Sequence, residues 1–506
     1  MTLEEMISKN RADCTGCSAC KNICPKNCIN MERDGEGFLY PNINRDECIN
    51  CGRCEKVCPS LNFKATIPDR LPYVFVSMYL DDKVRRHSSS GGAFTALSEL
   101  VFEDGGIVFG AGFDKNWRVV HTAAENLDEL ENLRGSKYVQ SEIGDVYKNV
   151  KAELEGDRPV LFSGTPCQCA GLKSFLGKDY FNLLTVDIIC HGTPSPMLWE
   201  NYLEYIAKDH DIAHVNFRSK RNGWRIEHCF EINFYDCGHY LNSGIADMYF
   251  RQFLINLNLR SSCYECKFKF PNGKSDVTIG DAWGIQNYAP DLNDNRGTSL
   301  VIVHTDKGRE FVADSKLQGR LVDFDVMPIF NPCFLTSTPP DARRQKFFDE
   351  IKENPEMSLV IMKKYFHQNP NSVGVKGRDL KAETIQKYVA ISQHFANLRG
   401  QNVLFITPVL NMDIARFLAE RTVENFKDSG SYILHMQDDG QAVFMDALHP
   451  VINYNVDSSL ESIQTLIKDF HITDIFIERH MQLDKDITDF LNCGEFTLNY
   501  LELAVE

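Results

Sequence analysis

The sequence predicts a multidomain protein of mixed α and β structure (α+β and α/β), built from three parts. Three observations lead to this prediction. Two cysteine-rich runs lie within residues 1–65. Between residues 73 and 370, short apolar runs typical of buried strands alternate with small-residue turns and helical apolar spacing. From residue 400 to residue 506, strand-like and helix-like segments alternate again, which is typical of a small parallel α/β domain.

Composition sets the class of the protein before any motif is considered. The chain has 506 residues, of which 43% are apolar and 25% charged, as expected for about three globular domains. A net charge of −16 argues against nucleic acid as a partner, because phosphate binding needs clustered Lys and Arg. No apolar run reaches the length of a membrane span, and no secretory signal is recognisable. The 18 cysteines are therefore expected to be reduced thiols and metal ligands in the cytoplasm.

The cysteine runs of residues 1–65 have the spacing of iron–sulfur ligands. Each reads C-x2-C-x2-C-x3-C-P, which is the bacterial run that binds a 4Fe-4S cluster. In two-cluster ferredoxins the fourth cysteine of each run ligates the other cluster. The expected ligands are Cys14, Cys17, Cys20 and Cys58 for one cluster, and Cys48, Cys51, Cys54 and Cys24 for the second. Zinc knuckles or disulfides are the alternative, although zinc sites usually pair C-x2-C with a distant second pair. Cys28 is expected to be a buried packing thiol.

The central segment, residues 73–370, opens with a buried-type strand at 73–80 and a helix over 93–103. The loop between them ends in Ser-Ser-Ser-Gly-Gly, which can present backbone N–H groups to an anion or simply cap the helix. A hairpin is predicted over 106–122, and a second small-residue turn contains Ser136 and Lys137. Lys137 is a candidate phosphate or flavin contact, and a solvated lysine is the alternative.

Two further buried-type strands, at 159–163 and 183–189, each end just before a cysteine. In open α/β sheets, ligands bind beyond the carboxyl ends of the strands. A C-x2-C pair follows at Cys263 and Cys266. Together these thiols, Cys167, Cys190, Cys263 and Cys266, suggest a third 4Fe-4S site. A structural zinc site and four unligated thiols are the alternatives.

Residues 216–225 combine basic and aromatic side chains. Arg218 and Lys220 could neutralise an anionic cofactor or substrate, with Trp224 available for stacking, or the stretch could be a solvated basic turn. Asp281 lies at the tip of a predicted strand over 276–281, where it could contact a cofactor, orient a neighbour or cap the next turn. A strand at 298–304, a helix at 306–316 and an amphipathic helix over 340–365 complete the segment.

The order of the motifs carries a resemblance. The cysteine runs are followed by S-S-S-G-G, G-S-K-Y-V-Q-S, F-S-G-T-P-C-Q, I-I-C-H-G, F-R-S-K-R-N-G-W, C-x2-C and I-G-D-A-W-G. In this order, residues 10–340 resemble the family of the beta subunit of coenzyme F420-reducing hydrogenase. The resemblance implies a central domain that binds FAD and a third 4Fe-4S cluster, behind a two-cluster ferredoxin domain.

The resemblance also assigns residues. The FAD contacts that it implies are Ser90, Gly91, Gly92, Ser136, Lys137 and Thr165. It makes Cys167, Cys190, Cys263 and Cys266 the ligands of the third cluster. His191 and Asp281 are expected near the redox centre as catalytic residues. Independently of the resemblance, the charge and ring types of Arg218, Lys220 and Trp224 lead us to expect that they contact the cofactor or an anionic substrate.

The expected function is that of an iron–sulfur flavoprotein oxidoreductase. It would pass electrons between FAD, which faces a small-molecule substrate of hydride type, and clusters that serve a ferredoxin or another redox partner. One alternative is an electron-transfer subunit without its own organic substrate, and another is a zinc- or cluster-stabilised binding protein without turnover. A homo-oligomer is compatible with each of these functions.

The C-terminal segment, residues 400–506, lies outside the resemblance. Strands are predicted at 402–407, 431–435 and 473–477, and helices at 413–426 and 460–470. The segment has no G-x-G-x-x-G and no P-loop, so no nucleotide is assigned to it. Docking of a partner or substrate is the hypothesis for its role.

Overall fold

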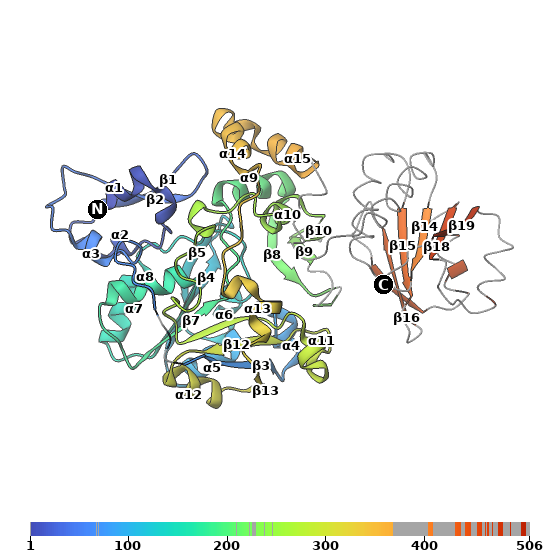
Figure 1. Cartoon of the computed structure of the whole chain (residues 1–506), viewed down its shortest axis with the longest axis horizontal. Helices are drawn as coiled ribbons and strands as arrows, with labels where there is room; N and C mark the ends of the chain where they lie inside the picture. The colour runs from blue at the N-terminus through green and yellow to red at the C-terminus, as the bar shows by residue number, and fades with distance from the viewer. Residues whose placement is uncertain are drawn as a thin grey trace. The chain divides into compact units, whose positions relative to one another are not determined.

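The computed structural model describes residues 2–367, except for 67, 69, 209, 222, 225–228, 237 and 245, together with strands and a few helical positions between 403 and 501. The chain forms two compact units (Figure 1). The first contains Met1–Tyr240 and Asp247–His367, and the second contains Leu241–Ala246 and Gln368–Glu506. The predicted class, a multidomain protein of mixed α and β structure, is confirmed. The N-terminal cysteine-rich segment and the central segment belong to the same compact unit.

The N-terminal segment folds around its two cysteine runs. After α1 (Leu3–Lys9), the helices α2 (Ala19–Ile23) and α3 (Arg53–Val57) each lie within one run, and β1 (Ile29–Arg33) pairs antiparallel with β2 (Leu39–Ile43) between them. A residue with left-handed backbone precedes each helix, Ser18 with φ 62° and Gly52 with φ 68°. The two runs therefore follow the same local path, as their equal spacing predicts.

An eight-stranded mixed sheet forms the centre of the first unit, in the order β13-β3-β12-β11-β7-β6-β4-β5. Its middle strands are β11 (Val277–Asp281), β7 (Leu183–Ile188), β6 (Val160–Gly164) and β4 (Ile107–Phe113), and they run parallel. The outer strands β3 (Tyr73–Tyr79), β12 (Ser299–Val303), β13 (Leu317–Val322) and β5 (Val119–Ala124) run antiparallel to their neighbours. The carboxyl ends of the four parallel strands consequently meet at one edge of the sheet.

Apolar side chains cover both faces of this sheet, as parallel strands require. Phe162 of β6 belongs to a core that includes residues of α7 (Val146–Glu155), α8 (Pro166–Leu176) and the N-terminal segment. The next residue back, Leu161, belongs to the opposite core, which includes residues of α5 (Ala93–Glu103), α6 (Leu127–Leu133) and α12 (Asp306–Asp314). The N-terminal segment is thus anchored through Ala19 and Val57 on the α7 and α8 side of the sheet.

The first unit also contains helices and strands outside this sheet. The helices are α4 (Asp82–His87), α9 (Pro196–Ala207), α10 (Met248–Leu254), α11 (Ile285–Tyr288), α13 (Val326–Phe330), α14 (Arg344–Glu353) and α15 (Ser358–His367). A three-stranded sheet has the order β10-β9-β8, with β8 (Ile212–Ser219), β9 (Cys229–Phe234) and β10 (His239–Ser243), and only the first two residues of β10 belong to the first unit. The helix predicted over 93–103 and the hairpin over 106–122 are confirmed as α5 and β4–β5. The single helix predicted over 340–365 is wrong, because Pro355 lacks a backbone donor and separates α14 from α15.

The second unit contains a six-stranded sheet in the order β17-β16-β15-β14-β18-β19. The predicted strands are found as β14 (Val403–Thr407), β15 (Ser431–Met436) and β18 (Asp474–Glu478), and β14 pairs parallel with both others. β16 (Gln441–Asp446) and β17 (Asn453–Asp457), which the sequence pattern did not reveal, pair antiparallel beside β15, and β19 (Thr497–Leu501) completes the sheet. The helix predicted at 413–426 and most of that at 460–470 lie outside the described residues. Among the described helices, none combines the length and the apolar character that crossing a membrane requires.

Candidate functional site

The cysteines of the N-terminal runs line two separate small cavities. Cys14, Cys17, Cys20 and Cys58 line one of them, which we call the first thiol cavity. Cys24, Cys48, Cys51 and Cys54 line the other, the second thiol cavity. In each cavity three thiols of one run meet the last thiol of the other run, so the geometry allows the crossed ligation of two clusters.

The two thiol cavities differ in exposure. All four thiols of the first thiol cavity are buried, whereas Cys51 of the second is exposed and Cys48 and Cys54 are partly exposed. Burial and the thiols around them raise the pKa of Cys17 and Cys20 above the usual thiol range. Four thiolates in this pocket therefore need a cationic metal centre to stabilise them.

A fifth thiol, Cys28, also lines the second thiol cavity. It is buried, and its Sγ lies 3.4 Å from the Sγ of Cys24. Its place against a predicted ligand is more specific than the general packing role that the sequence suggested.

The thiols of Cys167, Cys190, Cys263 and Cys266 also gather in the fold, and we call them the third thiol group. Burial, together with the nearby Cys266 and Cys263 thiols, raises the pKa of Cys167 to about 12. Burial raises the pKa of Cys190 too, and the Cys263, Cys167 and Cys266 thiols add to the shift. No three His, Cys, Asp or Glu side chains of the described residues are arranged to hold a single metal ion. Because a cubane has an iron at several corners, its thiolates are spread more widely than the ligands of one ion.

Local structure explains how the third thiol group assembles. Cys167 lies at the start of α8, directly after β6, and Cys190 follows β7. Cys263 ends the short helical turn Ser261–Cys263, and the backbone N–H of Thr193 donates to its Sγ at 3.4 Å. The Thr165 hydroxyl lies 3.1 Å from the Cys167 Sγ. Hydrogen bonds of this kind tune the potential of a cluster bound to the sulfurs.

The first thiol cavity and the third thiol group are neighbours. The Cys167 thiol is one of the groups that raise the pKa of Cys17. Gly171 of α8 packs on Cys17 so closely that a Cβ at this glycine would lie 3.0 Å from the Cys17 Sγ. The absence of a side chain at Gly171 therefore allows the N-terminal segment to approach α8.

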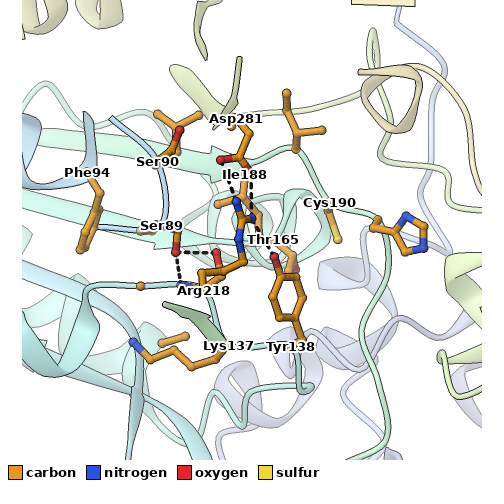
Figure 2. Close-up of a pocket in the computed structure, with 18 of the residues that line it drawn as sticks. Ser89, Ser90, Phe94, Lys137, Tyr138, Thr165, Ile188, Cys190, Arg218 and Asp281 are labelled. Atoms are coloured by element: carbon orange, nitrogen blue, oxygen red, sulfur yellow. Dashed lines mark hydrogen bonds and ion pairs between the residues drawn. The ribbon is translucent and has the colours of Figure 1, made fainter. Parts of the chain in front are cut away.

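A cavity of about 400 Å³, which we call the main cavity, opens at the carboxyl edge of the parallel strands (Figure 2). Gly110 of β4, Gly164 of β6, Ile188 of β7 and Asp281 of β11 all line it, and so does Cys190 of the third thiol group. Ligands of open α/β sheets bind at this kind of edge. The cavity volume lies within the range of small-molecule and cofactor sites.

The loop before α5 forms one wall of the main cavity. Ser90 and Gly92 line it, whereas Gly91 packs behind them. The backbone N–H of Gly91 donates to the Ser299 Oγ at 2.9 Å, and a Cβ at Gly91 would lie 2.5 Å from the Ser299 backbone nitrogen. The Ser136 backbone N–H donates to the Ser89 Oγ at 2.7 Å, which joins the two small-residue loops (Figure 2).

Lys137 and Lys220 are both partly buried, and their Nζ atoms donate to backbone carbonyls. Lys137 lines the main cavity and donates to the carbonyls of Asn132 and Arg134, at 2.7 and 2.9 Å. Lys220 lies behind the loop before α5, where it donates to the carbonyl of Ser90 at 2.5 Å and to two further carbonyls. Burial lowers the pKa of each lysine to about 7. Lys220 thus supports the cavity wall instead of lining the cavity.

The first residues of the basic stretch 216–225 belong to strand β8. Arg218, the first basic residue of the stretch, lines the main cavity. Arg218 is buried and pairs with Asp281, and it also donates to the Tyr138 Oη at 3.1 Å (Figure 2). Trp224 does not line the cavity. Its Nε1 donates to Asp281 at 2.9 Å, and its ring stacks on Trp283, which does line the cavity.

His191 lines the main cavity next to Cys190. Its Nε2 donates to the Asn256 Oδ1 at 2.6 Å, and its Nδ1 lies 3.4 Å from the Cys333 Sγ. Burial lowers the pKa of His191, which favours the neutral imidazole. Cys333 also lines the cavity, and sequence reasoning missed it because it belongs to no spaced cysteine motif. The sequence analysis also assigned no role to Tyr138, although it lies in the motif G-S-K-Y-V-Q-S, or to Arg260, which lies in no quoted motif.

Comparisons with known proteins give one family, that of the coenzyme F420 hydrogenase/dehydrogenase beta subunit. Residues 75–148 match the model of its N-terminal part, and residues 157–325 match the model of its C-terminal part. Residues 13–62 match the 4Fe-4S dicluster domain. Among solved structures, a chain of the F420-reducing [NiFe] hydrogenase complex from Methanosarcina barkeri is 16% identical, with a TM-score of 0.35, over 61% of this chain and 97% of that chain. No curated protein matches the sequence.

Proposed function

The chain belongs to the coenzyme F420 hydrogenase/dehydrogenase beta-subunit family, and we propose on this premise that it is an FAD-dependent iron–sulfur oxidoreductase. Family membership and the dicluster match make it an iron–sulfur protein of a family of oxidoreductase subunits. We further propose that it carries three 4Fe-4S clusters, which connect an FAD in the main cavity with a redox partner protein.

The succession of thiol groups toward the main cavity is the observation that carries this proposal. The second thiol cavity lies at the surface, and α2 joins it to the buried first thiol cavity, because Cys20 of α2 lines the first cavity and Cys24, directly after α2, lines the second. Cys17 of the first thiol cavity is close to Cys167 of the third thiol group, and Cys190 of that group lines the main cavity. Electrons could therefore pass in single steps between the surface and the main cavity, in either direction.

The walls of the main cavity suit a flavin nucleotide. The two eleven-residue helices α5 and α8 begin at the cavity, since Ala93 and Thr165 line it. Helix N-termini favour phosphate groups through their free N–H groups and their dipole. Ser90, Gly92, Ser136 and Lys137 line the same cavity and are the remaining candidate contacts. FAD would supply an acceptor for the two electrons of a hydride and would release them singly to the clusters.

The aromatic side chains of the main cavity are the candidate contacts for a substrate. Phe250, Phe253 and Phe330 line it together with Trp283, close to His191 and Cys333. These aromatic side chains favour a planar, largely apolar substrate, with Arg218 able to meet an anionic group on it. The partner protein would dock where Cys51 and Ile49, the latter 57% exposed, lie at the rim of the second thiol cavity.

Anaerobic purification and metal analysis test the proposal. About twelve irons, matching sulfide and one FAD per chain are expected from three cubanes and one flavin. Reduction of the bound flavin by a substrate in the isolated chain would show that the chain is an enzyme. Flavin that only a partner protein can reduce would instead indicate an electron-transfer subunit. About eight irons with zinc and no flavin would contradict the proposal.

Variants assign the metal to individual thiols. Replacement of Cys190 or Cys263 by Ser should remove about four irons and leave the N-terminal clusters in place. Cys169→Ala is the matched control, because Cys169 is a buried thiol of α8 that lies in the sheet core. It should keep the full iron content. Equal iron loss from Cys190→Ser and Cys169→Ala would mean that iron is lost through general unfolding.

A further inference from the structure

Arg260 is a fully buried cation between the first thiol cavity and the third thiol group. Its backbone precedes the helical turn that carries Cys263, and its carbonyl accepts from the Cys263 N–H at 2.9 Å. Its side chain extends to the first cysteine run, where Nε donates to the Cys14 carbonyl at 2.9 Å. Arg260 thus contacts the backbone of one cysteine from the first thiol cavity and of one from the third thiol group.

The partners of the Arg260 guanidinium within hydrogen-bond or stacking distance are all uncharged. Nη1 donates to the Gln140 Oε1 at 3.2 Å, and the guanidinium lies on the Tyr40 ring, 4.0 Å from its centroid. Nη2 is buried and has no hydrogen-bond partner among the described residues. Burying a cation without a counter-charge is strongly unfavourable, so this arrangement calls for negative charge nearby.

The nearby Asp34 carboxylate is already paired with Arg11, so the negative charge would come from the thiolates of Cys14 and Cys263, whose backbones Arg260 contacts. A cubane held by four thiolates has a net negative charge, which increases on reduction. Two such clusters would flank Arg260.

The first cysteine run leaves space for the guanidinium. Gly16, between Cys14 and Cys17, has φ 71°, and a Cβ at this position would lie 3.1 Å from the Arg260 Cζ and 2.5 Å from the Gln140 Nε2. Any larger residue here would displace Arg260 or its partner Gln140. The glycine at position 16 therefore allows the backbone of the first cysteine run to approach Arg260 closely.

We propose that Arg260 is an electrostatic bridge between the clusters of the first thiol cavity and the third thiol group. It acts as a positioning residue that favours the reduced form of both clusters and so raises both reduction potentials. The inference rests on the proposed function, since it requires a cluster at each of the two sites. The cluster of the second thiol cavity, whose ligands do not contact Arg260, serves as an internal reference.

Redox titration followed by electron paramagnetic resonance tests the bridge in the anaerobically purified full chain. Arg260→Gln removes the charge, and the reduction equilibrium of the first and third clusters should then shift at least tenfold toward the oxidised form. This corresponds to a fall of about 59 mV for each one-electron couple. The second cluster should keep its potential. Arg260→Lys retains the charge, so the potentials of the first and third clusters should stay close to their wild-type values.

Gln140→Glu is a second variant, for use if Arg260→Gln does not retain its clusters. The new carboxylate would lie beside Nη1 and neutralise Arg260 without removing it, so the same two potentials should fall. Arg85→Gln is the control, because Arg85 is another buried arginine but is paired with Asp294. It should leave all three potentials unchanged.

The outcomes separate this inference from the proposed function. Three clusters with potentials that do not change in Arg260→Gln, or that all change equally, would overturn the bridge and leave the proposed function intact. A lysine variant that behaves like the glutamine variant would also overturn it, because packing and not charge would then be responsible. A wild-type chain without the third cluster, seen in its iron content, would overturn both.

Discussion

Arg218 holds Asp281 in a two-pronged ion pair at the edge of the main cavity, with Nη1 2.9 Å from Oδ2 and Nη2 3.2 Å from Oδ1. Asp281 also accepts from the Trp224 Nε1, so both of its oxygens have partners from β8 or the turn after it. These contacts make Asp281 an anchor for Arg218. Its predicted catalytic role stays a prediction, and this environment favours the positioning of Arg218 over proton transfer.

Removing both partners of this pair should cost less stability than the sum of the two single removals. Asp281→Ala leaves the buried Arg218 charge without its counter-ion, a change that typically destabilises a protein by about 3–5 kcal/mol. Arg218→Met combined with Asp281→Leu replaces the pair by apolar side chains and should cost less than the two single changes together. Denaturant unfolding of wild type, Arg218→Met, Asp281→Leu and the double variant under anaerobic conditions measures the difference. Additive losses would show that the pair is not coupled.

Gly91 should tolerate no side chain, since a Cβ there would lie 2.5 Å from the Ser299 nitrogen and 2.7 Å from the Ser77 carbonyl oxygen. Both obstacles are backbone atoms of neighbouring strands, so they cannot rotate away. Gly91→Ala should destabilise the protein by about 1–3 kcal/mol and lower its flavin content. Gly156→Ala is the control, because the nearest atom is 3.4 Å away, and its unfolding temperature should not fall. Unchanged flavin and stability in Gly91→Ala would contradict the geometry of this loop.

Which contacts could be predicted depends on whether a local sequence pattern records them. Cys167 and Cys190 could be predicted to lie together, because parallel strands end at a common edge and each cysteine follows such a strand. The contact of Arg260 with Cys14 could not, since it joins residues far apart in sequence through one side chain and no periodic pattern records it. The environment of Lys220 could not be predicted either. Its charge suggested an anionic ligand, but in the fold its Nζ donates to the backbone carbonyls of Arg85 in α4, Ser90 and Arg296.

Lys137 should make stability depend on pH in the alkaline range. Burial lowers its pKa from 10.5 to about 7. Below pH 7 the folded protein carries the unfavourable buried charge in full. Between about pH 7 and 10 the unfolded chain binds more protons than the folded protein, so this contribution to stability rises with pH. Lys137→Met should therefore be most stable relative to wild type below pH 7, and its advantage should shrink toward pH 10.

Thermal unfolding of wild type and Lys137→Met across this pH range gives the comparison. Lys148→Met serves as the control, because Lys148 is at the surface, where it pairs with Asp145. The difference between this control and wild type should not change between pH 7 and pH 9. A parallel pH profile for Lys137→Met and wild type would mean that Lys137 keeps its ordinary pKa in the folded protein.

Cys28 should be able to replace Cys24 as a ligand in the second thiol cavity. Both thiols line this cavity, and their Sγ atoms lie 3.4 Å apart, so a small movement of the loop would bring Cys28 to the position of its neighbour. Cys24→Ser should consequently keep most of the iron of the second cluster, with an altered paramagnetic signal. The double variant Cys24→Ser with Cys28→Ser should lose about four irons.

Cys51→Ser is the comparison for this prediction. Cys51 lines the same cavity, between Cys48 and Cys54 in the sequence, and its run contains no additional cysteine that could replace it. It should disrupt the second cluster even with Cys28 present, while Cys28→Ser alone should leave the iron content unchanged. If Cys24→Ser loses as much iron as the double variant, Cys28 cannot reach the cluster. Its closeness to Cys24 would then reflect packing alone, which is the role that its position in the sequence suggested.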